Sequence, residues 1–411
     1  MRLLYSIGIF IASFAIKLLA KFNTKLKLGV NGRKVSLKTL RSKIEPNDKT
    51  FWFHCASLGE YEQGLPVFEA LRRRYPDYKI VLTFFSPSGF EVRKNAKIAD
   101  VAVYMPMDSL ANAKQFLTIV NPTLIIFVKY EIWPNVLYVI KKRNINALLI
   151  SAVFRQDQSF FKWYGGLMRS SLSAFNHIYT QDQNSKNLLN TNGFKNVSVS
   201  GDTRFDRVFN QLKLDNNIPF IKKFINTKTC VVFGSTWPAD DKLFFDFINK
   251  NQNKELKFLI APHNIKKNYI TKIKAELTKK TICFSDMADK NVSEYDVFIL
   301  DTIGYLSKIY SYAHIVYVGG AAGSTGLHNI LEPAVFGIPI LIGNNYDKFP
   351  EAKALISKGG VDSVSTSQEL SNKLNALLLD EKLTKQKGKI NSDFILENKG
   401  AVHKILDTIS L

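Results

Sequence analysis

Short apolar runs alternate with amphipathic segments along most of the chain. In the first half, the segments between the runs have the spacing of helices, as over 63–74, 110–120 and 134–142. The apolar runs have the length of buried strands and cover 51–55, 80–84, 101–105, 124–128, 147–151, 178–180 and 197–200. Strands that alternate with helices in this way predict βαβ units and a parallel, doubly wound sheet.

A second series of the same kind follows a polar stretch, 212–228, which we interpret as a linker. Its apolar runs cover 230–233, 258–261, 297–300, 315–318 and 338–342. A length of 411 residues is comfortable for two domains. We therefore expect two Rossmann-like α/β domains, 30–211 and 228–411, facing a central cleft at the carboxyl ends of their strands.

The N-terminal segment has a different pattern. Residues 3–20 are apolar except for Tyr5, Ser6, Ser13 and Lys17, and basic residues flank them on both sides. This length is about what a bilayer crossing needs, although Lys17 weakens a full span. A secretory signal peptide is the alternative, but no Ala-x-Ala-type cleavage site follows. We expect residues 1–22 to form a membrane-anchor helix that spans the bilayer or lies in its interface, with the bulk of the chain on the cytoplasmic side.

The net charge of the chain is strongly positive. Fifty-six Lys and Arg residues against 35 Asp and Glu residues give +21, which favours a polyanion or an anionic membrane surface. No nucleic-acid-binding motif accompanies these cations, so we expect no nucleic-acid partner. A hydrophobic content of 46% and a charged content of 22% exclude a disordered chain. The three cysteines are far apart, which fits reduced thiols in a cytosolic protein.

A glycine-rich segment, 319–333, lies between the apolar run 315–318 and a helix expected to begin at 329–332. Its four glycines let the main chain approach a ligand, and a helix start offers free N–H groups to an anion. The spacing is neither Gly-x-Gly-x-x-Gly nor the Walker form. The segment predicts a phosphate-bearing donor substrate, with a plain βα turn as the alternative.

Polar residues also follow several strands of the first domain. Glu60 comes after the first strand, where a carboxylate can accept a proton from an attacking hydroxyl group. It also stands three residues after Ser57, which is capping-box spacing, and position alone favours a capping role. Glu131 follows the fourth strand, and Arg204, after the seventh, can pair with a phosphate.

The second domain offers imidazoles at comparable positions. His263 follows a strand and His328 lies in the glycine-rich segment, and either is a ligand contact or a structural residue. The sequence has neither an Asp-x-Asp motif nor a His/Glu cluster with metal-ligand spacing, so it implies no divalent cation.

Taken in order, five motifs resemble those of the 3-deoxy-D-manno-octulosonic acid (Kdo) transferases of lipopolysaccharide synthesis. They are His54-x-x-Ser-x-Gly-Glu60, Glu131-x-Trp-Pro-Asn135, Gly201-x-x-x-Phe-Asp206, Gly319-Gly320 and His328-Asn-x-Leu-Glu-Pro333. The resemblance covers nearly the whole chain. It implies a GT-B fold and an inverting, metal-independent transfer of Kdo from CMP-Kdo to a hydroxyl of the lipid A precursor (lipid IVA) at the inner membrane. It requires no cofactor beyond this donor substrate.

The resemblance also assigns roles to residues. Glu60 is expected to be the general base, and Glu131 and Arg204 are expected to stabilise the transition state. The residues expected to hold CMP are Pro262, His263, Thr302, Ile303, Gly304, Asn329, Ile330, Leu331 and Glu332. Lys129 departs from the family, which commonly has a glutamate there. The alternative is another GT-B glycosyltransferase, or an epimerase, that uses a UDP-sugar; the anchor and the Glu60 motif argue against it.

Overall fold

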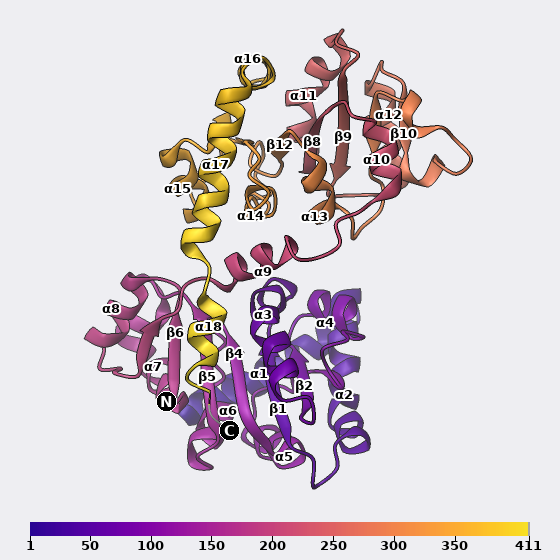
Figure 1. Cartoon of the computed structure of the whole chain (residues 1–411). Coiled ribbons are helices and arrows are strands. Elements are labelled where there is room, and N and C mark those ends of the chain that lie inside the picture. The colour runs from indigo at the N-terminus through magenta and orange to yellow at the C-terminus, as the bar shows by residue number, and fades with distance from the viewer. Residues whose placement is uncertain (410–411) are drawn as a thin grey trace. The chain divides into compact units, whose positions relative to one another are not determined.

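The computed structural model describes residues 1–409, which form two compact units (Figure 1). Unit 1 contains Met1–Arg207 and the segment that begins at Lys399, and unit 2 contains Val208–Asn398. The predicted second domain, 228–411, therefore differs from unit 2 at its end, because the chain returns to unit 1 after Asn398. Residues 410 and 411 of that predicted domain lie outside the described residues.

Unit 1 is built on a parallel sheet of seven strands in the order β3-β2-β1-β4-β5-β6-β7, counted within residues 1–409. The strands are β1 (Thr50–Cys55), β2 (Lys79–Phe84), β3 (Val101–Tyr104), β4 (Pro122–Val128), β5 (Asn146–Ala152), β6 (His177–Thr180) and β7 (Val197–Val199). Each falls on one of the predicted apolar runs. The prediction of a doubly wound parallel sheet is confirmed for this unit.

Successive side chains of a strand point to opposite faces of the sheet, and here both sets are apolar. Helices therefore cover both faces of this sheet. The helices of unit 1 are α1 (Arg2–Leu19), α2 (Thr24–Lys43), α3 (Leu58–Arg74), α4 (Pro87–Arg93), α5 (Leu110–Val120), α6 (Pro134–Lys142), α7 (Gly166–Ser171), α8 (Gln183–Thr191), the start of α9 (Thr203–Gln211) and α18 (Ala401–Leu406). Short 3-10 turns, η1 (Ser159–Phe161), η2 (Trp163–Gly165) and η3 (Leu172–Ala174), precede and follow α7.

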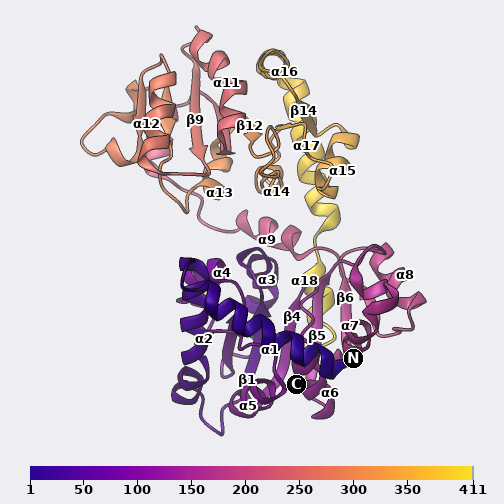
Figure 2. The same ribbon diagram turned by 180° about the vertical axis from the view of Figure 1, so that it is seen from behind.

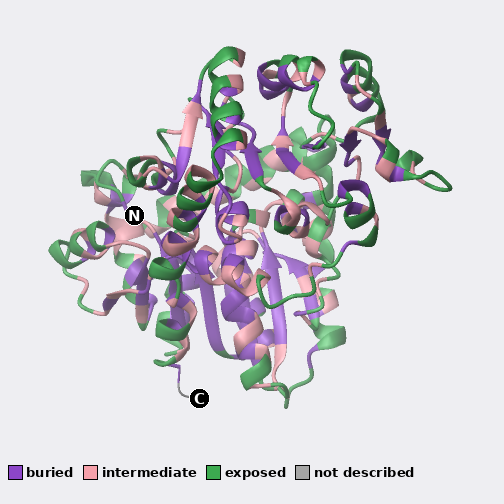
Figure 3. Cartoon of the chain, turned by 45° about the horizontal axis from the view of Figure 1, so that its top comes forward, coloured by how far each residue is buried: buried purple, intermediate pink, exposed green. Residues whose placement is uncertain are grey.

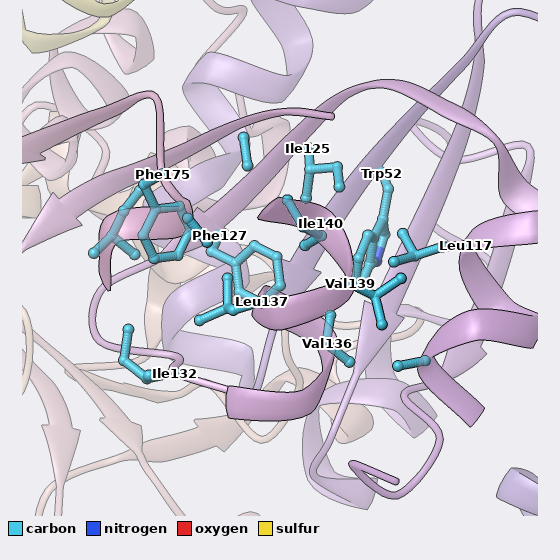
Figure 4. Close-up of a cluster of buried hydrophobic side chains, with 14 of the residues drawn as sticks. Trp52, Leu117, Ile125, Phe127, Ile132, Val136, Leu137, Val139, Ile140 and Phe175 are labelled. Atoms are coloured by element: carbon cyan, nitrogen blue, oxygen red, sulfur yellow. The ribbon is translucent and has the colours of Figure 1, made fainter. Parts of the chain in front are cut away.

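One of the two cores of unit 1 is shown in Figure 4. Trp52 of β1 and Phe127 of β4 meet Leu117 of α5 and Ile140 of α6 there, all fully buried or nearly so. The opposite faces of the same strands pack on Phe68 of α3 and on α18. Figure 3 shows the strands almost uniformly as buried. This double coverage explains why the strands are continuous apolar runs rather than alternating ones.

The return of the chain to unit 1 has a clear physical cause. Ile405 of α18 and Ile409 after it complete the core on the α3 side of the sheet. The carboxylate of Asp206 accepts hydrogen bonds from the main-chain N–H groups of Gly400 (2.9 Å) and Ala401 (3.0 Å) at the start of α18. Both contacts join residues almost two hundred positions apart, so no local pattern could have predicted them.

Unit 2 repeats the architecture with a second seven-stranded parallel sheet, in the order β10-β11-β9-β8-β12-β13-β14 over the described residues. Its strands are β8 (Thr229–Thr236), β9 (Leu256–Pro262), β10 (Thr281–Cys283), β11 (Val297–Ile299), β12 (Ile315–Val318), β13 (Ile340–Gly343) and β14 (Val361–Val364). Five of these lie on predicted runs. The two edge strands, β10 and β14, were not predicted.

The helices of unit 2 include one where the sequence suggested a linker. They are α10 (Pro219–Ile225), α11 (Pro238–Lys250), α12 (Lys267–Glu276), α13 (Leu306–Ile309), α14 (Leu331–Ala334), α15 (Pro350–Lys358), α16 (Ser367–Leu379) and α17 (Glu381–Asn398), with 3-10 turns η4 (Phe284–Asp286), η5 (Val292–Glu294) and η6 (Tyr310–Tyr312). The linker prediction for 212–228 is wrong over α10, because Ile221, Phe224 and Ile225 are buried in the core of the unit.

The predicted N-terminal helix is present as α1. It is apolar and long enough to cross a membrane by length and composition, and none of its residues is buried. It lies along unit 1, as Figure 2 shows, beside α2 and α6. The hydroxyl of Tyr5 donates to Asp108 Oδ2 at 2.9 Å, and Ser6 meets the side-chain amide of Asn135 at 3.2 Å.

Candidate active site

In each sheet, the strand order reverses near the middle. The reversal lies between β1 and β4 in unit 1 and between β8 and β12 in unit 2. Ligands of open α/β sheets bind at the carboxyl ends of the strands beside such a switch point. Glu60 follows β1, Glu131 follows β4, and the glycine-rich segment follows β12. The predicted residues thus lie where the topology favours a site in each unit.

Glu60 lies in the first turn of α3, and it is 7% exposed. Its carboxylate accepts a hydrogen bond from the main-chain N–H of Ala56, and its own N–H donates to Ser57 Oγ at 3.4 Å. The capping contact predicted from the Ser57–Glu60 spacing is therefore present. The hydrogen bond from Ala56 holds the carboxyl group at the end of β1.

The pKa of Glu60 is raised from its ordinary value to about 7, mainly by burial and secondarily by the negative charge of Glu131. Hydrogen bonds from the main chain and the positive charge of Lys129 act in the opposite direction. The carboxyl group of Glu60 therefore titrates near neutral pH. A carboxylate with such a pKa is well matched to accepting a proton from a hydroxyl group.

Glu131 is held by an aromatic network at the ends of β1 and β4. The indole N–H of Trp133 lies 3.1 Å from both Glu131 Oε2 and His54 Nε2. His54 is fully buried, its Nδ1 lies 2.8 Å from Thr83 Oγ1, and this hydroxyl also accepts from the indole N–H of Trp52 at 2.8 Å. This chain of contacts fixes the side chain of Glu131, whose charge acts on Glu60.

Sequence reasoning did not assign roles to Trp52 and Thr83. The available signal was their register, because His54 pairs with Thr83 across β1 and β2, and Trp52 lies two residues before His54 on the same face. Polar side chains at the ends of two neighbouring buried strands indicate a hydrogen-bonded cluster.

Arg204 is linked through Asp202 to α3, the helix that carries Glu60. Its guanidinium group contacts Asp202 Oδ2 through Nε (2.8 Å) and Nη2 (2.7 Å), and its main-chain N–H donates to Asp202 Oδ1 at 2.9 Å. Asp202 Oδ1 also accepts from the side-chain amide of Gln63 on α3, at 3.0 Å. Gln63 and Asp202, neither of which was predicted, therefore orient the predicted cation.

In unit 2, His263 belongs to a stack of three rings. Pro262 ends β9, and His263, the next residue, stacks on Trp237 (ring centroids 4.7 Å apart) and on His328 (4.5 Å apart). Trp237 is the N-cap of α11, directly after β8, and His328 lies in the glycine-rich segment after β12. Sequence reasoning proposed His263 and His328 separately and gave no role to Trp237, which joins them.

Both imidazoles of the stack are neutral at neutral pH. Burial lowers the pKa of His263, and burial and the nearby His263 lower the pKa of His328 to about 4. The indole N–H of Trp237 donates to His328 Nε2 at 3.0 Å. Because an indole can only donate, His328 carries its proton on Nδ1. His328 is therefore a neutral hydrogen-bond donor with a fixed tautomer.

The buried carboxylate of Asp240 holds the glycine-rich segment against α11. It accepts from the main-chain N–H groups of Trp237 (2.9 Å), Gly320 (2.8 Å) and Ala322 (3.3 Å), and from the hydroxyl of Tyr317 at 2.8 Å. Gly320 has φ +98°, and a Cβ there would lie 2.0 Å from the carbonyl oxygen of Gly326. Only glycine fits this position.

The other residues predicted to hold a nucleotide lie on two loops of unit 2. Thr302, Ile303 and Gly304 lie between β11 and α13, and the side chain of Ile303 is exposed. In the second loop, the amide of Asn329 donates to Glu332 Oε1 at 3.2 Å, and both residues are partly buried.

The predicted helix after the glycine-rich segment, α14, is a single turn. It begins at Leu331, and the side chains of Ile330 and Leu331 are buried in the core, so only their main chain can meet a ligand. A one-turn helix has a weak dipole. Main-chain N–H groups of the loop are therefore the stronger candidates for contacting an anion than the helix as a whole.

Two parallel seven-stranded α/β units, each with polar residues at its switch point, define the GT-B fold. The same fold is found in the UDP-GlcNAc 2-epimerase from Neisseria meningitidis, with a TM-score of 0.62 and 16% identity over 88% of this chain and 99% of that one. At this identity the likeness concerns the fold alone.

Sequence comparison identifies the family. Residues 31–207 match the model of the 3-deoxy-D-manno-octulosonic-acid transferase (kdotransferase) family. The Kdo transferase of Haemophilus influenzae is 26% identical over 89% of this chain and 87% of its own length. That of Aquifex aeolicus is 28% identical over 80% of this chain and 85% of its own length. These matches together cover most of the chain and confirm the resemblance to the Kdo transferase family that its motifs predicted.

Proposed function

We propose that this Kdo-transferring glycosyltransferase takes Kdo from CMP-Kdo and passes it, with inversion, to a hydroxyl of the lipid A precursor. In this proposal Glu60 is the general base, no metal ion takes part, and α1 holds the enzyme at the cytoplasmic face of the inner membrane. Family membership supports the transfer of Kdo. The donor nucleotide, the acceptor, the base and the location are the parts that we add.

The observation that carries the proposal is the environment of Glu60. A buried carboxyl group with a pKa of about 7 lies at the switch point of the unit 1 sheet. A purely structural cap would be better served by an exposed carboxylate with an ordinary pKa, because its charge would then be solvated. The raised pKa supports a second role in which this group takes up a proton.

The proposed reaction is a single displacement. The acceptor hydroxyl gives its proton to the Glu60 carboxylate while its oxygen forms a bond to the anomeric carbon of Kdo. The bond between that carbon and the phosphate oxygen breaks, and CMP leaves with the electron pair. Glu131 would stabilise positive charge that develops on the sugar, and Arg204 negative charge on the leaving phosphate.

Unit 2 has the groups that binding of a nucleotide monophosphate requires. The glycine-rich segment follows β12, its residues Ser324 and Thr325 are exposed, and His328 offers a neutral Nδ1–H donor. Glu332, oriented by Asn329, is suited to accept from sugar hydroxyls of the nucleotide. We therefore assign donor binding to unit 2 and acceptor activation to unit 1.

The location of the enzyme follows in the proposal from α1 and from charge. α1 exposes large apolar side chains, among them Leu3 and Phe10, although it is attached to unit 1 through Tyr5. A chain with a net charge of +21 is attracted to anionic lipids and to the phosphates of a lipid A precursor.

The test is a transfer assay with a lipid acceptor. The full-length protein is incubated with CMP-Kdo and a lipid A precursor, and release of CMP is measured together with the mass of the lipid product. We expect CMP release and a product heavier by Kdo, with neither when the acceptor is omitted. Absence of CMP release in the complete mixture would overturn the proposal, and turnover of a UDP-sugar instead would favour the alternative donor class.

A further inference from the structure

Unit 1 displays two adjacent aromatic side chains to solvent, outside the proposed active site. Trp163 is 92% exposed and Tyr164 is 52% exposed, both in the 3-10 turn η2 before α7. Large exposed aromatic rings lose the free energy that burial would give them. Their neighbours Phe160 and Phe161, in contrast, pack on the core of unit 1.

The turn that carries these rings is firmly built. The main-chain N–H of Gly165 donates to the carbonyl of Lys162 at 3.0 Å, and Arg169 Nη1 donates to the carbonyl of Phe160 at 2.7 Å. A Cβ on Gly165 would lie 1.9 Å from the carbonyl oxygen of Ser159, so the main chain is closely packed there. Trp163 is therefore held outward by a folded scaffold.

The helix that follows this turn, α7, lies next to the start of α1. A hollow of about 510 Å³ is lined by Arg2 of α1, by Tyr138 and Lys141 of α6, and by Leu167 of α7. The guanidinium of Arg2 lies 3.5 Å from the centre of the Tyr138 ring. In both views of the chain, α7 lies beside the N-terminal end of α1 (Figures 1 and 2). The apolar helix and the aromatic turn thus belong to one region of unit 1.

The charges around the turn are mostly positive. Arg155, Lys162 and Arg169 accompany a single acid, Asp157, over residues 153–172. Tryptophan and tyrosine favour the boundary between lipid headgroups and acyl chains, where the ring is desolvated and its polar atom stays hydrated. Lysine and arginine beside them are attracted to anionic headgroups. Together these residues match the interface of an anionic bilayer.

We propose that the turn at Lys162–Tyr164 is a second membrane-contact element that inserts into the headgroup region of an anionic bilayer while α1 occupies the same interface. This inference rests on the membrane association in the proposed function. Two contacts on one rigid unit restrict its rotation on the membrane, and the second contact binds at the high effective concentration that the first creates. Unit 1 would then present its acceptor site to the lipid in a fixed orientation.

The experiment uses the full-length protein and vesicles that contain phosphatidylglycerol with brominated acyl chains, which quench tryptophan at close range. We expect vesicles to quench the wild-type protein and to leave Trp163→Phe almost unquenched, because Trp52 is fully buried and Trp133 and Trp237 are partly buried. Trp163→Ala should weaken vesicle partitioning roughly tenfold or more, since it removes about 100 Å² of ring surface that would otherwise move from water into the membrane. Leu379→Ala, which removes an exposed apolar side chain from unit 2, is the matched control and should leave partitioning unchanged.

Equal quenching of wild type and Trp163→Phe, or unchanged partitioning of Trp163→Ala, would overturn the inference. CMP release from a detergent-dispersed acceptor is measured on the same proteins and should be equal in wild type and Trp163→Ala. Failure of quenching with normal CMP release rejects only the second contact. Normal quenching without CMP release rejects only the proposed reaction.

Discussion

Replacing Glu60 by glutamine separates its two roles, because glutamine keeps the shape and a carbonyl oxygen but cannot take up the proton. The oxygen can still accept from the main-chain N–H of Ala56, so the start of α3 is preserved. The glutamine side chain, however, cannot act as a base. We expect turnover to fall by about two to four orders of magnitude with little change in CMP affinity.

The same substitution should change stability in a pH-dependent way. The pKa of Glu60 is about 7 in the folded protein and near 4.5 in the unfolded chain. The folded state therefore binds more protons between these two values, and the carboxyl group destabilises the fold increasingly as pH rises through this window. The difference corresponds to about 3 kcal/mol above the folded pKa. Glutamine does not ionise, so Glu60→Gln removes this destabilisation. The variant should therefore be more stable than the wild type in unit 1 at about pH 8 and about equally stable at about pH 4.

The assay compares wild type, Glu60→Gln and Glu60→Ala. Because the two units can unfold separately, stability is followed by hydrogen exchange of amides in unit 1, and CMP affinity is measured by calorimetry. Glu60→Ala also loses the acceptor for the main-chain N–H of Ala56 and should be less stable than Glu60→Gln by about 1 kcal/mol. Unchanged turnover in Glu60→Gln would show that Glu60 has only a structural role at the start of α3. A loss of stability near pH 8 would contradict the raised pKa of the buried carboxyl group.

Three further substitutions test the surroundings of the two sites. Lys129→Met removes a positive charge that lowers the pKa of Glu60, so the acidic limb of the pH profile of kcat/KM should move to higher pH. An unchanged profile would show that Lys129 does not influence the ionisation of the catalytic base. Asp240→Ala leaves four hydrogen-bond donors without their acceptor. It should lower the free energy of unfolding of unit 2 by about 3 kcal/mol or more in denaturant and abolish CMP binding. A variant of wild-type stability would refute the role of Asp240 in holding the glycine-rich segment. Trp237→Phe keeps the ring but removes the donor to His328, so CMP affinity measured by calorimetry should fall about fivefold without loss of stability, and an unchanged affinity would place this pair outside the donor site.

The sequence predicted the strands well where they are buried on both faces. β1 and β4 are continuous apolar runs because helices cover both sides of the sheet. β10 has only three residues, and Asp362 and Ser363 interrupt β14, so neither edge strand has a clear apolar pattern. The return of α18 to unit 1 depends on contacts between distant residues, which a local pattern cannot encode.

The sequence could predict those site residues that directly follow a strand. Glu60 and Glu131 follow strands at the switch point, and the glycine-rich segment follows β12. Trp237 and Asp240 were given no role, although Trp-Pro-x-Asp before an apolar run is a helix-start signal that marks the carboxyl end of β8. The raised pKa of Glu60 could not be predicted, because it comes from burial and from Glu131, whose position only the fold determines.

Transfer of Kdo with Glu60 as the base is tested most directly by mass spectrometry of the lipid after incubation of lipid A precursor and CMP-Kdo with wild type or Glu60→Gln. We expect a lipid that carries Kdo with the wild-type protein and about a hundredfold less product, or lower still, with Glu60→Gln at equal CMP binding. A lipid of unchanged mass with the wild-type protein, or equal product from both proteins, would contradict the proposed reaction and the role of Glu60.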